Sequence, residues 1–137
     1  MLNSQLANVS GRIGRVAEVL LGIAETVDIV EPIAKFSDHL KDKEGIGKIF
    51  NVGLEDWLPE QVSPDHEPYD LIWNQWCLGH LTDAQLVVYL KNCGKILKDG
   101  GWIIVKENMG TSGVDVFDEV DSSVTRCVRC FKRLQSI

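Results

Sequence analysis

Polar and aromatic side chains directly follow a short apolar stretch near the middle of the chain. Gln75, Trp76 and His80 come after the apolar residues 69–73 and just before a predicted helix. An imidazole can move a proton, an indole face can hold an apolar ring or a cation, and an amide can orient a polar ligand. Ligands of open α/β sheets bind where strands end and helices begin. We therefore expect a ligand site here, and the alternative is a core strand with two buried indoles.

A glycine loop and an acid predict a nucleoside-containing ligand. Gly11 and Gly14 precede a helical pattern, and glycines at such a turn let the backbone approach a cofactor. Glu31 lies about 17 residues after Gly14, at the end of the next predicted strand, where a carboxylate can accept both hydroxyls of a ribose. The alternative for Glu31 is a solvated carboxylate before a proline. This spacing does not distinguish NAD from S-adenosylmethionine.

Two further segments lie at the ends of predicted strands. In residues 51–57 the backbone around Gly53 can edge an adenine, with Leu54 against the face of the ring. Residues 106–109, together with the acidic run 118–123, follow the last predicted strand. Acids after a strand are usually solvated, so these two stretches indicate a site only in combination with the others.

The elements that must position these residues alternate along the chain. Helical or strand-like spacing predicts helices at 15–24, 33–40, 82–97 and 124–134, and strands at 26–30, 46–52, 69–73 and 102–106, the last one buried and preceded by a turn at 98–101. This order predicts an α/β fold with a Rossmann-like, doubly wound, mainly parallel sheet and helices on both faces. Residues 1–10 are polar and weakly patterned, so we expect a degenerate first strand. Closing C-terminal strands are missing, so residues 1–137 are interpreted as one partial domain.

Composition narrows the function classes. The 137 residues are 45% hydrophobic and 25% charged, with a net charge of −6. No apolar run reaches the roughly 18 residues of a membrane span. We therefore expect a soluble, intracellular protein that does not bind membranes. The net negative charge argues against nucleic-acid binding and mildly favours a basic partner. Cys127 and Cys130 have metal or redox spacing but no matching second pair, so reduced thiols are expected and no metal is implied.

The same segments resemble a known family. Residues 13–15, 27–32, 73–76, 79–83, 106–109 and 120–124 look, in order, like the α-N-terminal protein methyltransferases, and the resemblance covers residues 11–134. The blocks at 73–83 and 121–123 are specific to that family, whereas the glycine loop and the acid are shared by class I methyltransferases at large. The resemblance implies a class I methyltransferase fold with S-adenosyl-L-methionine as cofactor. It also implies a protein N-terminus beginning X-Pro-Lys or X-Pro-Arg as substrate, and a location in cytoplasm and nucleus.

The resemblance also implies a role for each matching residue. The cofactor-binding residues would be Gly14, Arg15, Glu31, Gly53, Leu54, Glu55 and Gln75. The substrate-binding residues would be Trp76, Asn108, Asp118, Asp121 and Ser123, and the catalytic residues His80, Asp121 and Asn108. An α-amine has a pKa near 8 and must be neutral to accept a methyl group, which suits His80 and Asp121 as the pair that removes its proton.

Departures from the family leave alternatives open. The family has an acid and two glycines where this chain has Asn8, Ser10 and Arg12, and arginine at the last position would hinder close approach of a cofactor. One alternative is therefore a catalytically inactive, methyltransferase-like fragment that acts as a binding partner. A second is a small-molecule class I methyltransferase, against which the acidic block argues. An NAD-dependent oxidoreductase is the least favoured, because nothing supplies a nicotinamide site.

Overall fold

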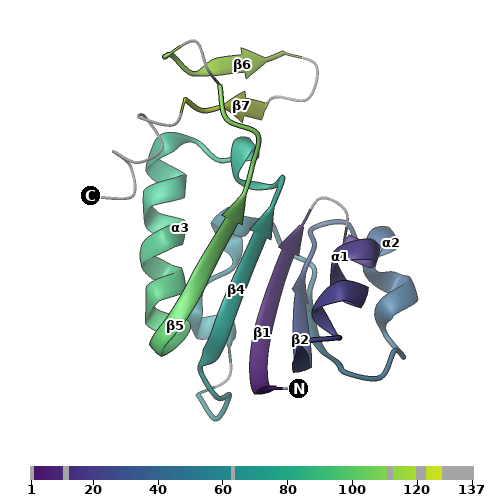
Figure 1. Cartoon of the computed structure of the whole chain (residues 1–137). Coiled ribbons are helices and arrows are strands. Elements are labelled where there is room, and N and C mark those ends of the chain that lie inside the picture. The colour runs from purple at the N-terminus through teal and green to yellow at the C-terminus, as the bar shows by residue number, and fades with distance from the viewer. Residues whose placement is uncertain (1, 11–12, 63, 111–112, 120–122, 128–137) are drawn as a thin grey trace.

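A five-stranded parallel sheet forms the centre of the protein in the computed structural model, which describes residues 2–10, 13–62, 64–110, 113–119 and 123–127. The strand order is β3-β2-β1-β4-β5, and every neighbouring pair is parallel (Figure 1). The strands are β1 (Leu2–Ser10), β2 (Ala24–Val30), β3 (Ile46–Phe50), β4 (Tyr69–Gln75) and β5 (Leu97–Lys106). The order reverses between β1 and β4, where α/β sheets of this type bind their ligands.

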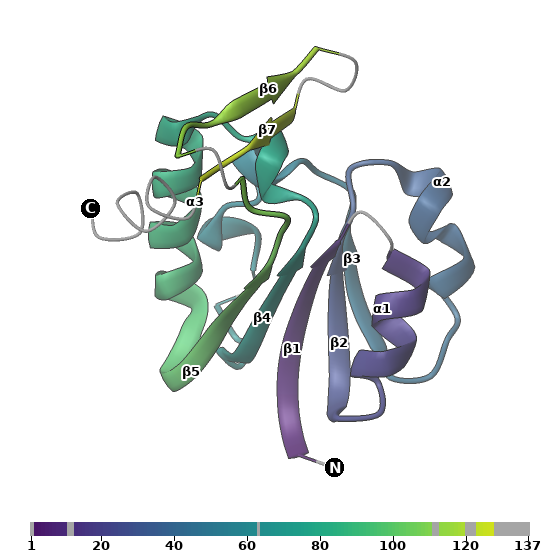
Figure 2. The ribbon, with the colours of Figure 1, turned by 45° about the horizontal axis from the view of Figure 1, so that its top comes forward.

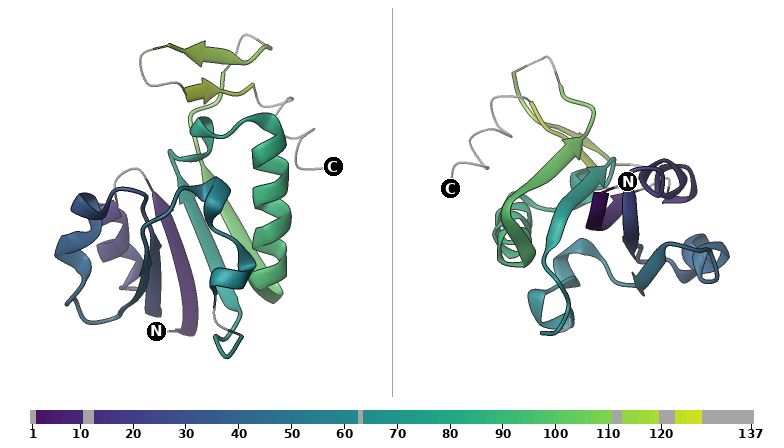
Figure 3. Two further views of the ribbon diagram at one scale, coloured as in Figure 1. Left: turned by 180° about the vertical axis from the view of Figure 1, so that it is seen from behind. Right: turned by 60° about the horizontal axis from the view of Figure 1, so that its bottom comes forward.

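Helices cover both faces of the sheet. On one face lie α1 (Ile13–Leu20) and α2 (Ala34–Ser37), the latter continued by the 3₁₀ turn η1 (Asp38–Leu40). On the other face lie α3 (Asp83–Ile96) and the turns η2 (Leu54–Asp56) and η3 (Pro59–Gln61), seen from behind in Figure 3. The turn η4 (Leu78–His80) joins β4 to α3. The predicted doubly wound arrangement is therefore confirmed.

Each face has its own apolar core. Ala17 and Leu20 of α1 pack on Val27 and Ile29 of β2, and all four side chains are buried. The core of the other face contains an aromatic group in which the Trp57 ring lies 5.9 Å from Phe50, 6.2 Å from Tyr69 and 6.5 Å from Tyr89. The two layers fix the sheet from both sides and so hold the carboxyl ends of its strands in place.

The start of α3 is stabilised by a reciprocal cap. The Thr82 hydroxyl accepts a hydrogen bond from the Gln85 backbone N–H at 3.1 Å, and the Gln85 side chain accepts one from the Thr82 N–H at 2.9 Å. This capping box begins the helix just after η4, as the Thr82-Asp83 signal predicts. The cap therefore fixes where the segment that carries His80 ends.

Three sequence-based expectations about the elements are wrong. Residues 2–10 are not a degenerate strand but form β1 at the centre of the sheet, because β2 and β4 supply main-chain partners on both sides. The strand at 102–106 is not buried, since it forms the sheet edge, where Trp102 is 72% exposed. The helix expected from Val124 begins instead as β7 (Ser123–Thr125), which pairs antiparallel with β6 (Val116–Asp118).

Smaller differences concern the chain after β4. The expected turn at 98–101 lies inside β5, where Gly100 takes a φ of +79° and the register with β4 shifts. Cys127 is disulfide-bonded, so the expectation of a reduced thiol is wrong for this residue. The remainder of the predicted helix, from 128 onward, lies outside the described residues. None of the helices in the described part of the chain has the length and apolar character needed to cross a membrane.

Candidate functional site

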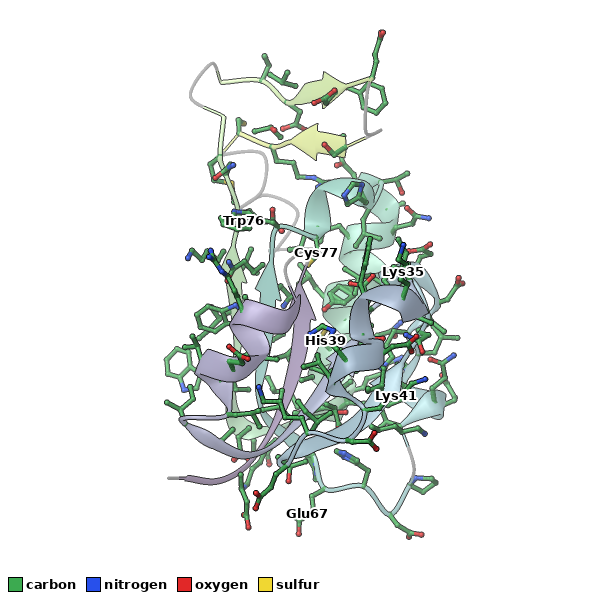
Figure 4. All side chains as sticks on the ribbon, turned by 90° about the vertical axis from the view of Figure 1, so that its right-hand side faces the viewer. Lys35, His39, Lys41, Glu67, Trp76 and Cys77 are labelled. Carbon is green, nitrogen blue, oxygen red and sulfur yellow. The ribbon has the colours of Figure 1, made fainter. Side chains whose placement is uncertain are left out.

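A cavity of about 380 Å³ opens at the carboxyl ends of β2 and β4. Its walls come from the segment after β2, from the η2 region and from the segment after β4. Figure 4 shows Trp76 and Cys77 near the β6–β7 hairpin, at the end of the sheet opposite Glu67. The lining residues are Val30, Glu31, Pro32, Ile33, Phe36, Gly53, Leu54, Glu55, Trp76, Cys77, His80 and Leu81. This size falls in the range of about 300–1,000 Å³ typical of small-molecule sites.

Glu31 is the buried acid of this cavity. It is 6% exposed, and its Oε1 accepts a hydrogen bond from the Ile33 backbone N–H at 3.0 Å. Burial raises the pKa of the Glu31 carboxyl, while the Ile33 hydrogen bond acts in the opposite direction. The Asn51 side-chain amide donates to the Glu31 carbonyl at 2.9 Å and so ties the end of β2 to the end of β3. A buried carboxylate held in this way is suited to accept hydrogen bonds from ligand hydroxyls.

Apolar side chains face the remainder of the cavity. Ile33 is 48% exposed, Phe36 is 52% exposed, and Leu54 is half-buried, so all three offer surface to a ligand. Gly53 and Glu55 lie beside Leu54, and the Glu55 carboxylate comes within 2.6 Å of the point where a Cβ on Gly53 would stand. An apolar wall next to one buried acid fits a ligand that has a flat ring and a polyhydroxylated part.

A second, polar cavity of about 270 Å³ adjoins the first. Trp76 and His80 line both cavities, so they stand at the junction between them. The Trp76 side chain is half-buried, and the Lys106 Nζ lies 5.6 Å from the centre of its ring. The remaining lining residues of the polar cavity are Gly79, Glu107, Asn108, Asp118, Ser123, Val124 and Thr125. Five of these, Glu107, Asn108, Asp118, Ser123 and Thr125, have side-chain oxygens that can accept hydrogen bonds.

The β6–β7 hairpin closes the polar cavity. Figure 2 shows it across the top of the sheet, above the segment after β4. Asp118 at the end of β6 pairs with Ser123 at the start of β7, which places both side chains at one end of the hairpin. Arg126, 3% exposed, ties the chain after β7 to η4, because its guanidinium donates to the Leu78 carbonyl at 3.0 Å and to the Leu81 carbonyl at 2.6 Å. The hairpin is thus bonded to the segment that carries His80.

Comparison with known proteins decides the family. Residues 2–136 match the family described as AdoMet dependent proline di-methyltransferases. The chain belongs to this family. It is 46% identical over 135 residues to alpha N-terminal protein methyltransferase 1 of Schizosaccharomyces pombe, an alignment that covers 96% of this chain and 59% of the relative. It is 38% identical over 128 residues to N-terminal Xaa-Pro-Lys N-methyltransferase 1 of Bos taurus, which covers 89% of this chain and 55% of the relative.

Solved structures agree with the methyltransferase family. A SAM-dependent methyltransferase from Leishmania major superposes with a TM-score of 0.82 at 30% identity, covering 97% of this chain and 53% of that one. Phosphoethanolamine N-methyltransferase 1 of Haemonchus contortus superposes with a TM-score of 0.66 at 18% identity, covering 90% of this chain and 26% of that one, and supports the fold alone. The predicted class I methyltransferase fold and the family resemblance are confirmed. The chain spans a little over half the length of the two curated relatives above.

The structure brings most of the predicted site residues of this methyltransferase-family chain together. Glu31, Gly53, Leu54 and Glu55, predicted to bind the cofactor, line the first cavity, and Asn108, Asp118 and Ser123, predicted to bind the substrate, line the second. Gly14 and Arg15 line neither, since Gly14 lies in the first turn of α1 close to the His39 ring and Arg15 is exposed. Gln75 also lies outside both cavities, buried, with its side-chain oxygen accepting from Trp73 Nε1 at 3.0 Å. Asp121 lies outside the described residues.

Sequence reasoning missed three residues that shape the site. Glu107 and Gly79 lie inside the motifs that were recognised, but neither residue type identifies a role there. Arg126 follows the Asp-Ser-Ser block and looks like a solvated cation in the sequence, yet it is buried. Their contacts depend on residues far away in the chain, so no local pattern could have identified them.

A larger hollow lies elsewhere. About 530 Å³ open at the amino ends of β4 and β5, beside Ile23, Leu71, Trp102 and Ile104. No predicted site residue lines this hollow, and ligands of parallel α/β sheets bind at the opposite, carboxyl end. The two smaller cavities joined at Trp76 and His80 are therefore the candidate site.

Proposed function

We propose that the protein transfers a methyl group from S-adenosyl-L-methionine to the α-amino group of a protein N-terminus that begins X-Pro-Lys or X-Pro-Arg. One observation carries the proposal: Trp76 and His80 line both the cavity with the buried acid and the polar cavity. A donor in the first cavity and an amine in the second would therefore meet at these two side chains. Holding two reactants in line is the main catalytic demand of methyl transfer.

The first cavity fits the proposed cofactor. Glu31 would accept hydrogen bonds from the ribose hydroxyls, and Leu54, Ile33 and Phe36 would offer apolar surface to the adenine, since all four line this cavity. When bound, S-adenosyl-L-methionine supplies an electrophilic methyl group on its sulfonium. The sulfonium end would have to lie toward Trp76, because that residue separates the first cavity from the second.

The second cavity fits a short cationic peptide. The Trp76 ring offers an apolar face to the proline, and Asn108 offers an amide to the peptide backbone. Asp118 is exposed on the hairpin and offers a carboxylate to the basic side chain at the third position. The net charge of −6 agrees with a basic substrate.

His80 is the proposed proton acceptor. Its side chain is exposed at the cavity junction, so a neutral imidazole there can accept the proton of the substrate ammonium and pass it to water. The neutral amine would then be able to accept the methyl group that bound S-adenosyl-L-methionine supplies, with S-adenosylhomocysteine as the leaving group. The α-amine has a pKa near 8, so the protonation equilibrium of the substrate needs only a modest shift to give the neutral amine.

Calorimetric titration of the 137-residue chain with S-adenosylhomocysteine is the first test. We expect binding, followed by methylation of an X-Pro-Lys peptide and none of the same peptide with an acetylated N-terminus. The Trp76→Leu variant is expected to lose peptide turnover. The Trp102→Leu variant is the matched control, because that indole is 72% exposed and lines the 530 Å³ hollow and neither of the two site cavities.

Each contrary result points to a specific alternative. Absence of binding by the folded chain overturns the proposal and leaves the inactive, partner-binding fragment as the better hypothesis. Binding with turnover of small amines but not of the peptide leaves the small-molecule methyltransferase. Loss of peptide turnover in both tryptophan variants overturns the assignment of Trp76.

A further inference from the structure

The segment 76–81, between β4 and α3, contains an unfavourable backbone conformation. Trp76 has a φ of +53°, and it is the one non-glycine residue with positive φ in the described part of the chain. This region is disfavoured for bulky side chains and persists only where surrounding contacts enforce it. Trp76 is also one of the two residues at the cavity junction. The contacts that enforce its conformation therefore bear on how the two cavities meet.

Residues 106 and 107, at the end of β5, bind three consecutive backbone N–H groups of this segment. The Trp76 N–H donates to the Lys106 carbonyl at 3.0 Å. The next two N–H groups, of Cys77 and Leu78, both donate to Glu107 Oε1, at 2.8 and 2.9 Å. Successive N–H groups around a left-handed residue form a concave site for an anion, and here the anion is the Glu107 carboxylate. Hydrogen bonds to a carboxylate are stronger than those to a neutral acceptor.

Arg126 binds the same segment through its carbonyl groups. Its guanidinium donates to the carbonyls of Leu78 and Leu81, and its Nε donates to Asp83 Oδ1 at 3.2 Å. Glu107 therefore binds the N–H groups of Cys77 and Leu78, and Arg126 binds the carbonyls of Leu78 and Leu81. His80 lies between the two residues whose carbonyls Arg126 binds. Each side chain meets backbone groups of the complementary kind. The Glu107 carboxylate, which only accepts hydrogen bonds, meets N–H groups, and the Arg126 guanidinium, which only donates them, meets carbonyls.

Both residues come from the elements that form the polar cavity. Glu107 directly precedes Asn108, and Arg126 follows β7, which carries Ser123. Each connects the substrate side of the site to the segment that carries Trp76 and His80. A change at either contact would alter the position of both junction residues. Arg126 lines neither cavity, whereas Glu107 also lines the polar cavity.

We propose that Glu107 and Arg126 are positioning residues that together hold segment 76–81 and thereby set the distance between the cofactor and substrate cavities. They act through the backbone and not by contact with the reacting atoms. This inference deepens the proposed function, and its kinetic part rests on it. The structural part does not, because backbone protection and the position of the Trp76 ring can be measured without turnover.

The first test uses the full 137-residue chain and amide hydrogen exchange measured by NMR. Glu107→Leu removes both acceptor contacts, so exchange at the Cys77 and Leu78 amides is expected to accelerate about tenfold or more, and the Trp76 indole N–H signal is expected to shift. Glu107→Gln keeps one acceptor oxygen but loses the charge, so a smaller acceleration in the same direction is expected. Glu18→Leu and Glu18→Gln are the matched controls, because Glu18 pairs with Lys43 on the exposed side of α1.

The second test separates positioning from general stability. In Glu107→Gln and Arg126→Lys we expect the KM for an X-Pro-Lys peptide to rise about tenfold while the Kd for S-adenosylhomocysteine changes less than about twofold. Should Glu107→Leu fail to fold, Glu107→Gln provides both measurements.

Each outcome decides one part of the inference. Unchanged amide exchange at Cys77 and Leu78 in the Glu107 variants overturns the proposal that Glu107 holds segment 76–81, whatever the activity of these variants. Accelerated exchange with unchanged kinetics and an unmoved Trp76 indole signal overturns the positioning role. A wild-type chain that binds no S-adenosylhomocysteine and methylates no peptide overturns the proposed function alone, since the exchange rates and the indole signal still decide whether Glu107 positions Trp76.

Discussion

The carbonyl oxygen of Val124 lies 2.9 Å from the point where a Cβ on Gly79 would stand. Strand β7 therefore packs directly on the backbone of η4, with no room for a side chain between them. The same two residues line the polar cavity. The glycine is required by this close approach and not by an unusual φ angle, so any larger residue must push the hairpin away from η4.

Gly79→Ala tests this packing. The added methyl group should displace β7 by a few tenths of an ångström, which widens the polar cavity and raises the KM for an X-Pro-Lys peptide several-fold. Binding of S-adenosylhomocysteine should not change, because Gly79 does not line the first cavity. Steady-state kinetics and calorimetry make the comparison.

Gly94→Ala is the control for that experiment. Apart from its neighbours along the helix, no atom of the described residues lies within 4 Å of its would-be Cβ. Gly94 stands inside α3, where alanine is the better helix former by about 0.5–1 kcal/mol. We expect a more stable protein with unchanged peptide KM. An equal rise in KM for both variants would show that the Gly79 effect is not specific to the hairpin contact.

Glu31→Gln should separate stability from binding. Burial raises the pKa of the Glu31 carboxyl above 4.5, so just above that pH the folded state keeps a proton that the unfolded state has lost. The stability contributed by this group therefore falls as pH rises through the window between 4.5 and the raised pKa. At pH 7 the folded protein still bears the cost of burying the ionised Glu31 carboxylate. The neutral glutamine should raise the melting temperature of the ligand-free protein at pH 7.

The same substitution should weaken binding of S-adenosylhomocysteine by about 10- to 100-fold, because a charged acceptor is lost. Glu25→Gln is the control, since Glu25 lies on the same strand and is exposed. Thermal melts between pH 4 and 7 and calorimetry at pH 7 provide the measurements. Unchanged affinity in Glu31→Gln would remove the acid from the proposed ribose site.

The sequence was sufficient to locate strands with a dense apolar pattern but not strands that depend on their neighbours. β4 is recognisable because its apolar residues are consecutive. β1 is not, because its order comes from main-chain pairing on both sides, as at Ala7, which pairs with Asp28 of β2 and Ile72 of β4. β6 and β7 have three residues each, and only their mutual pairing defines them. A local pattern carries no information about such partners.

The candidate site was predictable to the extent that it follows from parallel topology. Glu31 and Gly53 lie after neighbouring strands, and a parallel sheet places the ends of those strands at one edge. Glu107 and Arg126 could not be predicted in this way. They bind backbone groups 29 to 48 residues away in the chain, so their side chains show no spacing relative to the groups they bind.

Tyr69→Phe should destabilise the protein without affecting binding. The Tyr69 hydroxyl donates to Asp28 Oδ2 at 2.6 Å, and Asp28 is 2% exposed. His66 Nε2 and the Lys48 backbone N–H also bond to that carboxylate, at 2.9 and 2.8 Å. Loss of one donor to a buried charge should cost about 1.5–3 kcal/mol in the free energy of unfolding.

The chain's other tyrosine provides the comparison. Tyr89 is also buried, but its hydroxyl donates to the neutral side-chain oxygen of Asn74, so Tyr89→Phe should cost about 0.5–1.5 kcal/mol. Urea denaturation of both variants measures the difference. Equal losses would show that the charge on Asp28 does not strengthen its hydrogen bond with Tyr69.

The thiols of Cys77 and Cys93 should resist modification while the protein is folded. Burial raises the pKa of the Cys93 thiol to about 12, and burial followed by the nearby Glu107 carboxylate raises the pKa of Cys77 as well. Because the thiolate is the reacting form, alkylation by iodoacetamide at pH 8 should be far slower in the native protein than in urea. Mass spectrometry of the peptides that contain each cysteine follows the reaction.

Cys77 is the stricter test, because it lines the first cavity and shape alone does not exclude the reagent. Rapid native alkylation of Cys77 would therefore show that the segment next to Trp76 opens to solvent, contrary to the backbone contacts with Glu107.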